Sequence, residues 1–504
     1  MDRSGDPAAL ADLIGRRLTT GTGGLYRRLA DAIAALIGSA ELPVGARLPA
    51  ERPLADALAV SRSTVVAAYD ELRARGLVES RRGSGTTVSP STGQGRSTAD
   101  KRMPTGYGES LFHRIAIGPG EVIAMTYAVD PGIPELAAEV EDLARTELPL
   151  LLQGVGYHPR GLEVLRVRIA EHFAEAGLPT SPDEIVVTSG AHQAIALVTQ
   201  MYLRTGAAVV IEQPSWPGCF DLFGAAGGRV VGVPLDDAGV RPDLLAAAFK
   251  EHQPAMLFVM PTFHNPTGRL MSAARRRQVA ELAAKHGVVV VEDNAYSAWD
   301  PAGPDVPAPL ASFAPKDAEV FTIGSVSKAV WGGLRIGWIR APRPLVERLA
   351  RHKALADLGS PVIDQALTAR LLPRLTELTS ARAKLATGRK HLLGQLLTER
   401  LPEWGWAEPD GGSALWIQLP DTDARVFAQV ALRHGVEVVA GRAMDPTGVH
   451  DGYLRVPFSY PAEVMTDAVD RMAAAWRELR RHGPPAGDRG GGVGDVFGTA
   501  PVII

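Results

Sequence analysis

The sequence predicts an α/β protein in two unequal parts, a small helical N-terminal domain and a large domain built on a mostly parallel sheet. Short amphipathic segments fill residues 25–89, and a polar stretch follows at 90–115. Helical patterns then alternate with continuous apolar runs such as "AMLFVMP" and "VVVVED". Runs of this kind are typical of parallel strands that helices cover on both faces.

Composition sets the outer bounds. A chain of 504 residues exceeds one ordinary hydrophobic core, and a hydrophobic fraction of 46% excludes a mostly disordered protein. Because Cys219 is the single cysteine, a disulfide within the chain and two-cysteine or four-cysteine zinc sites are excluded, and we predict no metal site. The sequence has no signal-peptide pattern and no apolar run of membrane-span length, so we expect a cytoplasmic protein without a membrane partner.

Turn-forming and polar stretches divide the chain into five ranges. We expect an N-terminal extension at 1–24, the helical domain at 25–89, a flexible linker at 90–115 and the α/β domain at 116–482. The tail at 483–504 is rich in Gly and Pro and is expected to be disordered.

The helical domain is predicted as helix, turn and helix, followed by two short strands. "LYRRLADAIAALIGSA" has one apolar face, and "ERPLADAL" is a second, shorter helix. A third helix begins at Ser61, a good N-cap, and ends at Gly76. "LVESRRGSGTTVS" then predicts two strands around Gly83 and Gly85, which together form a β-wing.

A third helix in this position presents its N-terminal residues to the base edges of DNA. The net charge of −3 does not favour a polyanionic partner for the whole chain, so a DNA site has to be local. The candidate base-reading and wing residues are Arg52, Ser61, Arg62, Ser63, Thr64 and Gly85. The candidate phosphate-binding residues are Arg47, Arg81 and Arg82.

The order of these elements resembles the winged helix-turn-helix of GntR-type bacterial regulators. The resemblance runs through every turn of "LPAERPLADALAVSRSTVVAAYDELRARGLVESRRGSGTTV". It implies a double-stranded DNA operator as partner. The alternative, a small helical domain whose arginines only solvate its surface, does not account for this order of elements.

In the large domain, polar residues follow the strand ends, where an open α/β sheet places its ligand crevice. In "IVVTSGAHQAIAL", Gly190 precedes a helix whose free N–H groups can receive a phosphate. "PTFHNPTG" places the Asn265 amide after another strand. "VVVVEDNAYSAW" places Asp293 at the end of a buried strand, with Tyr296 one turn later.

"FTIGSVSKAVWGGLRIGW" adds Lys328 to this set, with Ser325, Ser327 and Arg335 beside it. One chemistry uses all of these residue types. A lysine forms a Schiff base with an aldehyde cofactor, an aspartate keeps a pyridine nitrogen protonated, and amide and phenol groups bind the ring hydroxyl. Serine and arginine side chains, with a helix N-terminus, bind the phosphate.

Residues 125–475 resemble the fold-type I aminotransferases that use pyridoxal 5′-phosphate. The resemblance implies their transferase fold, with a mostly parallel sheet of the seven-stranded type in a large subdomain and a separate small subdomain. The roles it implies are Lys328 for the Schiff base and catalysis, Asp293 for the pyridinium, Asn265 and Tyr296 for the ring hydroxyl, and Ser325 and Arg335 for the phosphate, with Ser327 and Gly190 beside them.

Two further positions match the same family. Arg455 in "GYLRVPFS" matches the arginine that grips the carboxylate of a substrate, here an effector. Tyr157 in "GVGYHPRG" matches the tyrosine that reaches the phosphate across the dimer interface, which implies a homodimer.

The sequence departs from the family pattern at three cofactor-binding positions. Ala191 and His192 stand where members commonly carry a hydroxyl residue and a glutamine, so one phosphate contact is expected from the backbone alone. Trp216 in "EQPSWPG" stands at the ring-stacking position that is often tyrosine. His192 is a candidate proton shuttle, although a histidine that fills a hydrogen-bonding niche is the favoured interpretation.

We call the predicted DNA-binding domain at 25–89 the reader. The order of reader, linker and aminotransferase-like domain resembles the MocR/GabR subfamily of regulators. We therefore predict a transcription regulator in which pyridoxal phosphate, or an amine or amino acid that displaces Lys328 from it, shifts the domain arrangement and the DNA affinity. Two alternatives stay open. One is an active aminotransferase with a regulatory DNA-binding arm, and the other is a DNA-binding protein whose cofactor site is only structural.

Overall fold

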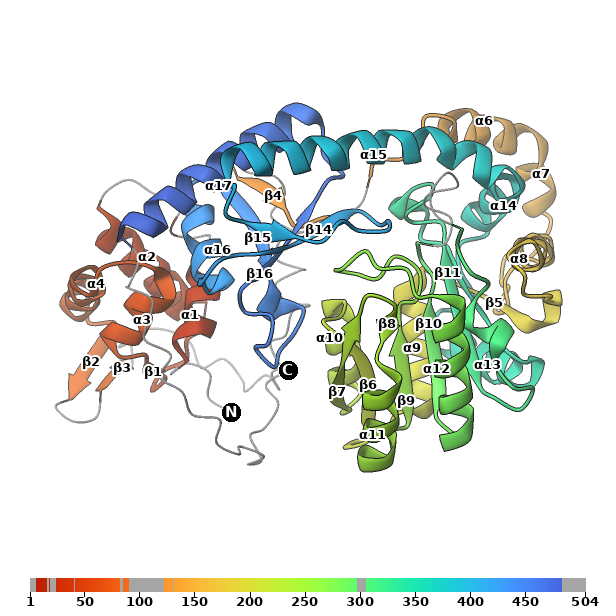
Figure 1. Cartoon of the computed structure of the whole chain (residues 1–504), viewed down its shortest axis with the longest axis horizontal. Coiled ribbons are helices and arrows are strands. Elements are labelled where there is room, and N and C mark those ends of the chain that lie inside the picture. Colours follow the sequence, from red (N-terminus) through yellow and green to blue (C-terminus); the bar gives the residue numbers. More distant parts are fainter. Residues whose placement is uncertain are drawn as a thin grey trace.

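The computed structural model describes residues 6–15, 18, 24–39, 41–81, 85–89, 122–128, 130–296 and 305–482. The predicted linker at 90–115, the predicted tail at 483–504, Arg82 and the side chain of Arg81 lie outside the described residues. Figure 1 shows three parts in a row: the helical reader, a small subdomain beside it and a large subdomain at the far end. No helix in the described ranges is both long and apolar enough to cross a membrane.

The reader is a helical domain with a three-stranded sheet in the order β1-β3-β2. Its elements are α1 (Pro7–Ile14), α2 (Leu25–Gly38), β1 (Arg47–Leu48), α3 (Glu51–Leu58), α4 (Arg62–Ala74), β2 (Val78–Arg81) and β3 (Gly85–Val88). The predicted helix-turn-helix with a wing is confirmed. Leu10 and Ile14 of α1, a helix within the range set apart as an N-terminal extension, are buried in the same core as Leu29, Leu54 and Leu72.

The large subdomain is built on an eight-stranded sheet in the order β5-β12-β11-β10-β9-β6-β7-β8. Its strands are β5 (Ile185–Thr188), β6 (Ala208–Gln213), β7 (Arg229–Asp236), β8 (Gly239–Val240), β9 (Met256–Val259), β10 (Val289–Asp293), β11 (Val320–Ser325) and β12 (Gly337–Arg340). β12 runs antiparallel to both of its neighbours, and the short β8 forms an antiparallel hairpin with β7. The remaining pairs are parallel, so the predicted mostly parallel sheet is confirmed.

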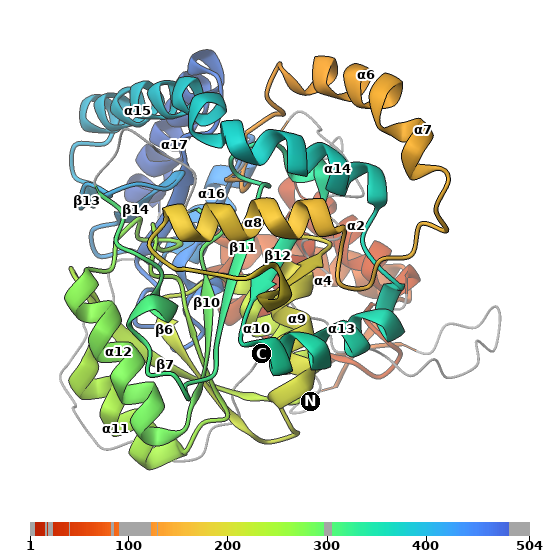
Figure 2. The ribbon, with the colours of Figure 1, turned by 90° about the vertical axis from the view of Figure 1, so that its right-hand side faces the viewer.

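Helices cover both faces of this sheet. The helices of this part are α6 (Leu136–Thr146), α7 (Leu148–Leu151), α8 (Glu163–Glu175), α9 (Ala191–Tyr202), α10 (Pro217–Ala225), α11 (Pro242–His252), α12 (Ala273–His286), α13 (Arg343–Asp357) and α14 (Val362–Leu371). In Figure 2, α11 and α12 lie on one side of the strands and α9 and α13 on the other. Val209 and Ile211 of β6 therefore join one core and Val210 the other, which explains why the whole strand is apolar.

The small subdomain is a five-stranded sheet in the order β13-β14-β16-β15-β4, covered by long helices. Its elements are β4 (Ile123–Met125), α15 (Leu375–Arg400), β13 (Gly405–Trp406), β14 (Ala414–Gln418), α16 (Ala424–Arg433), β15 (Val436–Ala440), β16 (Tyr453–Pro457) and α17 (Ala462–His482). β4 precedes the whole large subdomain in the chain but pairs in parallel with β15. The chain therefore crosses between the subdomains twice, and the candidate site lies where it crosses.

Candidate cofactor and DNA sites

Lys328 lies in a tight turn directly after β11. The Ser325 hydroxyl donates to the carbonyl of Ile336 at 3.0 Å and accepts from the Ser327 N–H at 3.1 Å, which holds the turn closed. Within it, Lys328 Nζ donates to the carbonyl of Ala128 at 2.9 Å. A lysine at a strand end is thereby held inward against the segment that follows β4.

Tyr296 lies beside this amine. Lys328 Nζ is 5.2 Å from the centre of the Tyr296 ring, a cation–π distance. The Tyr296 hydroxyl is 2.9 Å from the Ser413 hydroxyl, which in turn lies 3.3 Å from the carbonyl of Ala128. Ser413 was missed by sequence reasoning, because the residue precedes β14 in a Gly-Gly-Ser turn that carries no distinctive signal.

Asp293 is the last residue of β10, the strand next to β11. One of its carboxylate oxygens accepts from the Ala295 N–H at 3.0 Å. Burial raises the pKa of Asp293 to about 6, and the Ala295 N–H and the Lys328 ammonium both oppose this rise. Keeping this buried carboxylate charged is therefore costly unless a cation lies close to it. A protonated ring nitrogen would be such a cation.

The N-terminus of α9 and Arg335 form one cationic corner. Arg335 Nη2 donates to the carbonyl of Ser189 at 3.0 Å, next to Gly190, the N-cap of α9. A Cβ at Gly190 would lie 2.7 Å from Arg335 Nη2, and the backbone φ there is +87°. Glycine at this position is what lets the guanidinium approach the free N–H groups of the helix. Ala191 begins that helix.

Trp216 and His192 pack together at the edge of the same corner. Their rings meet edge to face, with centres 5.7 Å apart at an interplanar angle of 85°. A Cβ at Gly218 would lie 2.2 Å from Trp216 Cζ2, so only a glycine leaves room for the indole. Gly218 is a second residue that the motifs alone did not single out.

Arg455 on β16 faces the site from the small subdomain. Its Nη1 donates to Asn265 Oδ1 at 3.4 Å, and its Nη2 donates to the carbonyl of Thr126. Its side chain is buried, and within the described residues its Nε has no hydrogen-bond partner. Two predicted residues that lie 190 positions apart are therefore adjacent, and the guanidinium keeps hydrogen-bonding capacity for a ligand.

Tyr157 lies apart from this cluster. Its side chain is 67% exposed, between α7 and α8. Three exposed apolar side chains precede it, in α7 and directly after it: Leu150 is 66% exposed, Leu152 74% and Val155 85%. Within one chain the structure thus brings together the other predicted cofactor-site residues, and it leaves Tyr157 on an apolar surface.

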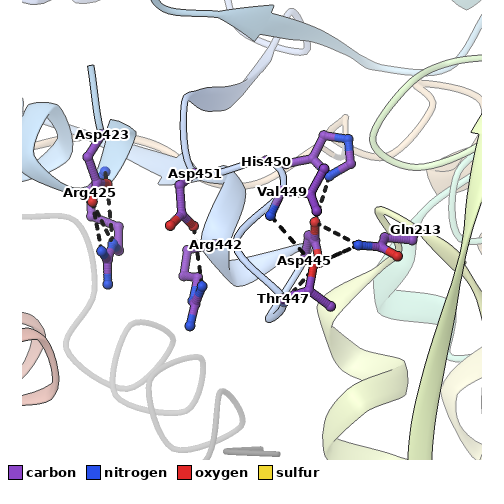
Figure 3. A network of polar contacts seen from close by, with 9 residues as sticks. All are labelled: Gln213, Asp423, Arg425, Arg442, Asp445, Thr447, Val449, His450 and Asp451. Carbon is purple, nitrogen blue, oxygen red and sulfur yellow. Dashed lines mark hydrogen bonds and ion pairs between the residues drawn. The ribbon is translucent and has the colours of Figure 1, made fainter. Parts of the chain in front are cut away.

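The subdomains also meet at a polar latch that sequence reasoning did not find (Figure 3). We define this latch as Gln213, Asp445, Thr447 and His450. The buried Asp445 carboxylate accepts from Gln213 Nε2 at 3.1 Å, from the Thr447 hydroxyl at 2.6 Å and from His450 Nδ1 at 2.7 Å. These bonds outweigh the effect of burial and lower the pKa of Asp445 to about 2. Gln213 lies three residues before Trp216, so the latch ties the Trp216 loop to the small subdomain.

The predicted DNA-contacting residues gather at the start of α4. The Ser61 hydroxyl caps the helix by accepting from the Thr64 N–H at 3.1 Å, and it lies 2.7 Å from the Ser63 hydroxyl. The Arg62 side chain is 69% exposed, with Nη2 3.8 Å from a Glu51 carboxylate oxygen. Arg52 is exposed on the first turn of α3. These residues present an open polar and cationic surface.

The wing follows α4 in the chain, and its strand β2 packs against α4. Arg47 and Thr87 are paired across β1 and β3, and Gly85 begins β3. The Arg47 guanidinium rests against Gly85, since a Cβ there would lie 3.0 Å from Arg47 Nε. The structure therefore brings Arg47 and Gly85 together at the wing.

Comparison with known proteins matches both halves of the chain. Residues 155–472 match the family model of aminotransferases of class I and II, and residues 25–88 match that of bacterial regulatory proteins of the gntR family. The chain is 32% identical over 480 residues to the uncharacterized HTH-type transcriptional regulator YisV of Bacillus subtilis, covering 91% of this chain and 96% of that protein. It is 28% identical over 399 residues to the probable rhizopine catabolism regulatory protein MocR of Rhizobium meliloti, covering 73% and 78%.

A solved structure of an aminotransferase matches the fold of the two subdomains. LysN, an α-aminoadipate aminotransferase from Thermus thermophilus complexed with N-(5′-phosphopyridoxyl)-L-leucine, superposes with a TM-score of 0.66 and 26% identity, over 75% of this chain and 98% of that one. An aminotransferase fold of this class implies pyridoxal phosphate, and a gntR-type reader implies DNA binding. The chain therefore belongs to the family of aminotransferases of class I and II, as a MocR-like fusion of a GntR-type transcription regulator with an aminotransferase-like domain.

Proposed function

We propose that pyridoxal phosphate binds at Lys328, and that the protein is a cytoplasmic transcription regulator whose DNA affinity responds to this cofactor or to an amine or amino-acid effector. The observation that carries the proposal is the convergence of Lys328, Asp293, Tyr296 and Arg455 in a chain that also presents an open DNA-reading helix. A cytoplasmic location follows from the proposed DNA partner.

The residues present fit the cofactor. Gly190 and Gly218 leave space where a methyl group would collide with Arg335 and Trp216, and Arg455 Nε is buried without a partner in the described residues. When bound, pyridoxal phosphate supplies an aldehyde that links to an amine and a ring that accepts electrons.

Each side chain then has a defined task. Lys328 Nζ would supply the amine for the link and could move a proton, and the Asp293 carboxylate would hold the ring nitrogen protonated. Asn265 and Tyr296 would bind the ring hydroxyl, and Trp216 would stack against the ring.

The remaining residues bind the charged groups. The proposed phosphate site consists of Arg335, Ser325, Ser327 and the N-terminus of α9, which Gly190, Ala191 and His192 form. The Ser325 hydroxyl already bonds to Ile336 and Ser327, so its role is to shape the turn as well as to face the phosphate. Arg455 is the proposed carboxylate grip for the effector.

A homodimer is part of the proposal. Leu150, Leu152, Val155 and Tyr157 are all more than half exposed, and such a run of large apolar side chains is typical of a surface that another chain covers. A second copy of this chain would cover the surface and bring Tyr157 toward the phosphate site of its partner. Two readers per dimer then match paired half-sites on an operator.

Footprinting tests the sensor. The DNA upstream of the protein's own gene is footprinted with cofactor-free protein, cofactor-loaded protein and Lys328→Ala, with a panel of amines added to each. We expect the loaded protein to differ from the other two in footprint or affinity, by about five- to a hundredfold. Identical footprints and affinities in all preparations would exclude sensing through Lys328.

An active aminotransferase with a DNA-binding arm is the second candidate. The observation in its favour is that Lys328, Asp293 and Arg455 are all present, as catalysis would require. Absorption spectra separate the two functions. A bound cofactor that takes up the amino group of an amino acid and returns it to a keto acid over repeated cycles supports turnover, and a cofactor spectrum that amino acids leave unchanged excludes it.

A further inference from the structure

The reader contacts the rest of the chain through α16, which packs against α3 (Figure 1). At the C-terminal end of α16, Arg433 Nη1 donates to the carbonyl of Leu58 at 2.8 Å, and Nη2 donates to that of Ala59 at 3.2 Å. These carbonyls close α3, where a helix leaves its last oxygens without partners and its dipole is negative. A guanidinium from the small subdomain therefore caps a helix of the reader.

Ala59 provides an independent sign that this turn is an interface. Its φ is +50°, in the left-handed region where a residue with a Cβ costs about 1 to 2 kcal/mol and glycine is the usual choice. The Ala59 side chain packs against the core of the small subdomain. The Ala59 methyl group is unfavourable for the conformation of the turn, but it contacts the small subdomain.

The contact reaches the core of the reader. Leu58 is buried in the reader core together with residues of α1, α2 and α4. Ser61, the N-cap of the recognition helix α4, follows Ala59 by two residues. α1 also approaches α16, since a Cβ at Gly15 would lie 2.6 Å from Gln429 Oε1. A movement of α16 would thus reach the predicted DNA-contacting residues through this packing.

The other end of α16 leads to the cofactor site. The N–H of Ala424, the first residue of α16, donates to the carbonyl of Asp451 at 2.7 Å. Asp451 lies in the loop 441–452, which also carries Asp445, Thr447 and His450 of the latch (Figure 3). Through Gln213 the latch holds the loop that leads to Trp216. One helix therefore connects the surroundings of the proposed ring-stacking residue with the reader.

We propose that Arg433 is a positioning residue for DNA recognition. Together with Ala59 it fixes the turn between α3 and α4 to α16, and so makes the orientation of the reader depend on the cofactor-binding domain. The inference rests on the proposed function, in which a ligand at Lys328 shifts DNA affinity. Because a ligand can shift only an equilibrium whose two states it contacts differently, a reader released from α16 no longer follows the ligand.

Two full-length variants test the contact from its two sides. Arg433→Gln removes the guanidinium, and Ala59→Gly removes the methyl group while suiting the left-handed turn, so this reader keeps its fold. The ratio of operator affinities with and without pyridoxal phosphate is measured for each. We expect a ratio of about five- to a hundredfold in the wild type and close to one in both variants.

Arg400→Gln is the matched control. Arg400 is an exposed arginine of the same subdomain, and it pairs with Asp470 of α17. Its affinity ratio should equal that of the wild type. If Arg433→Gln and Ala59→Gly also show the affinity ratio of the wild type, the inference is overturned and the proposed function stays intact.

If pyridoxal phosphate leaves the operator affinity of the wild type unchanged, a distance measurement still separates the two proposals. Spin labels at Ala35→Cys in α2 and Gln395→Cys in α15, both exposed positions, report the distance between reader and small subdomain. The native Cys219 is buried, and labelled chains are diluted with unlabelled ones. Arg433→Gln and Ala59→Gly should broaden the distance distribution. An unchanged distribution would overturn the positioning role of Arg433, independently of any sensing.

Discussion

Gly190 shows how the absence of a side chain shapes the candidate site. Its φ of +87° and the 2.7 Å gap that a Cβ would leave to Arg335 Nη2 both exclude larger residues. Gly190→Ala should therefore cost about 1 to 2 kcal/mol of stability and weaken cofactor binding, measured by thermal unfolding and by titration with pyridoxal phosphate. Gly388→Ala, in an open position of α15, should instead stabilise by about 1 kcal/mol.

Lys328 provides the most direct test at the residue scale. Lys328→Ala should lose the covalent cofactor and its yellow colour, because the link requires an amine at that position. Borohydride reduction followed by peptide mapping identifies the modified residue in the wild type. Lys390→Ala, which removes a lysine of α15 that pairs with Glu408, should keep the colour. Finding the cofactor on another lysine would contradict the assignment.

Glu212 and His264 form a buried pair behind the site that should make stability depend on pH. Their side chains are 1% and 3% exposed, and Glu212 Oε2 lies 3.5 Å from His264 Nε2. Burial raises the pKa of Glu212 to about 8 and lowers that of His264 to about 3. At neutral pH both groups are therefore uncharged, with the proton on the Glu212 carboxyl.

The sign of the Glu212 contribution follows from its raised pKa. The folded state keeps a proton that the unfolded chain releases above about pH 4.5, so this contribution falls as pH rises toward 8. Glu212→Gln removes the titration. Its stability relative to the wild type should rise with pH, by at most about 1.4 kcal/mol per pH unit, in denaturant unfolding at pH 5.5 and 8. A difference that is the same at both values would refute the assignment.

At the scale of elements, α4 combines a capped start with an exposed reading face. Ser61 caps the helix, and Val65, Tyr69 and Leu72 bury its opposite side in the reader core. The Tyr69 hydroxyl also donates to the carbonyl of Pro49 at 2.8 Å, which fixes α4 to the segment before α3. The exposed face is thus held by packing that does not involve the DNA-contacting residues.

Arg62→Ala should separate DNA reading from folding. If Arg62 contacts a guanine edge, the variant should lose about 1 to 3 kcal/mol at its preferred operator, measured by equilibrium binding at fixed salt. Its cofactor absorption should stay normal, since the substitution leaves the large subdomain untouched. Arg73→Ala, at the far end of the same helix where Arg73 pairs with Asp70, should bind the operator normally. Equal losses in both variants would indicate a general charge effect.

At the scale of the whole molecule, the proposed homodimer would add Tyr157 from a second chain to the candidate site. The site is built from both subdomains and from the segment after β4, yet Tyr157 remains 67% exposed on an apolar surface. A dimer that shares its sites would place one Tyr157 in each of them. Each complete site would then need residues from two chains.

Hybrid dimers test this arrangement. On the proposed arrangement, dimers made only of Lys328→Ala chains or only of Tyr157→Ala chains should each be impaired in cofactor binding. When they are mixed and reassembled, one site of each hybrid carries both substitutions and the other carries neither, so covalent cofactor with wild-type affinity should reappear. Binding that equals the sum of the two separate variants would exclude sharing of Tyr157 between chains.

The sequence alone determined the order of elements and the fold class. Apolar runs, caps and turn residues act over a few positions, so the strands around Asp293 and Lys328 and the helix that begins after Ser61 can be recognised locally. The ends of neighbouring parallel strands meet at one edge of a sheet, which is why polar residues after several strands predicted one site. The match to known families confirms that reading of the two halves.

Only the tertiary structure decided which residues outside the recognised motifs join the candidate site and the contact with the reader. Tyr296 meets Ser413 across 117 positions, Gln213 meets Asp445 across 232, and Arg433 meets Leu58 across 375. Serine, glutamine and arginine occur at many exposed positions, so no local pattern distinguishes these three. Their roles depend on which faces of the subdomains and the reader pack together, and that choice is made by the burial of apolar surface over the whole chain.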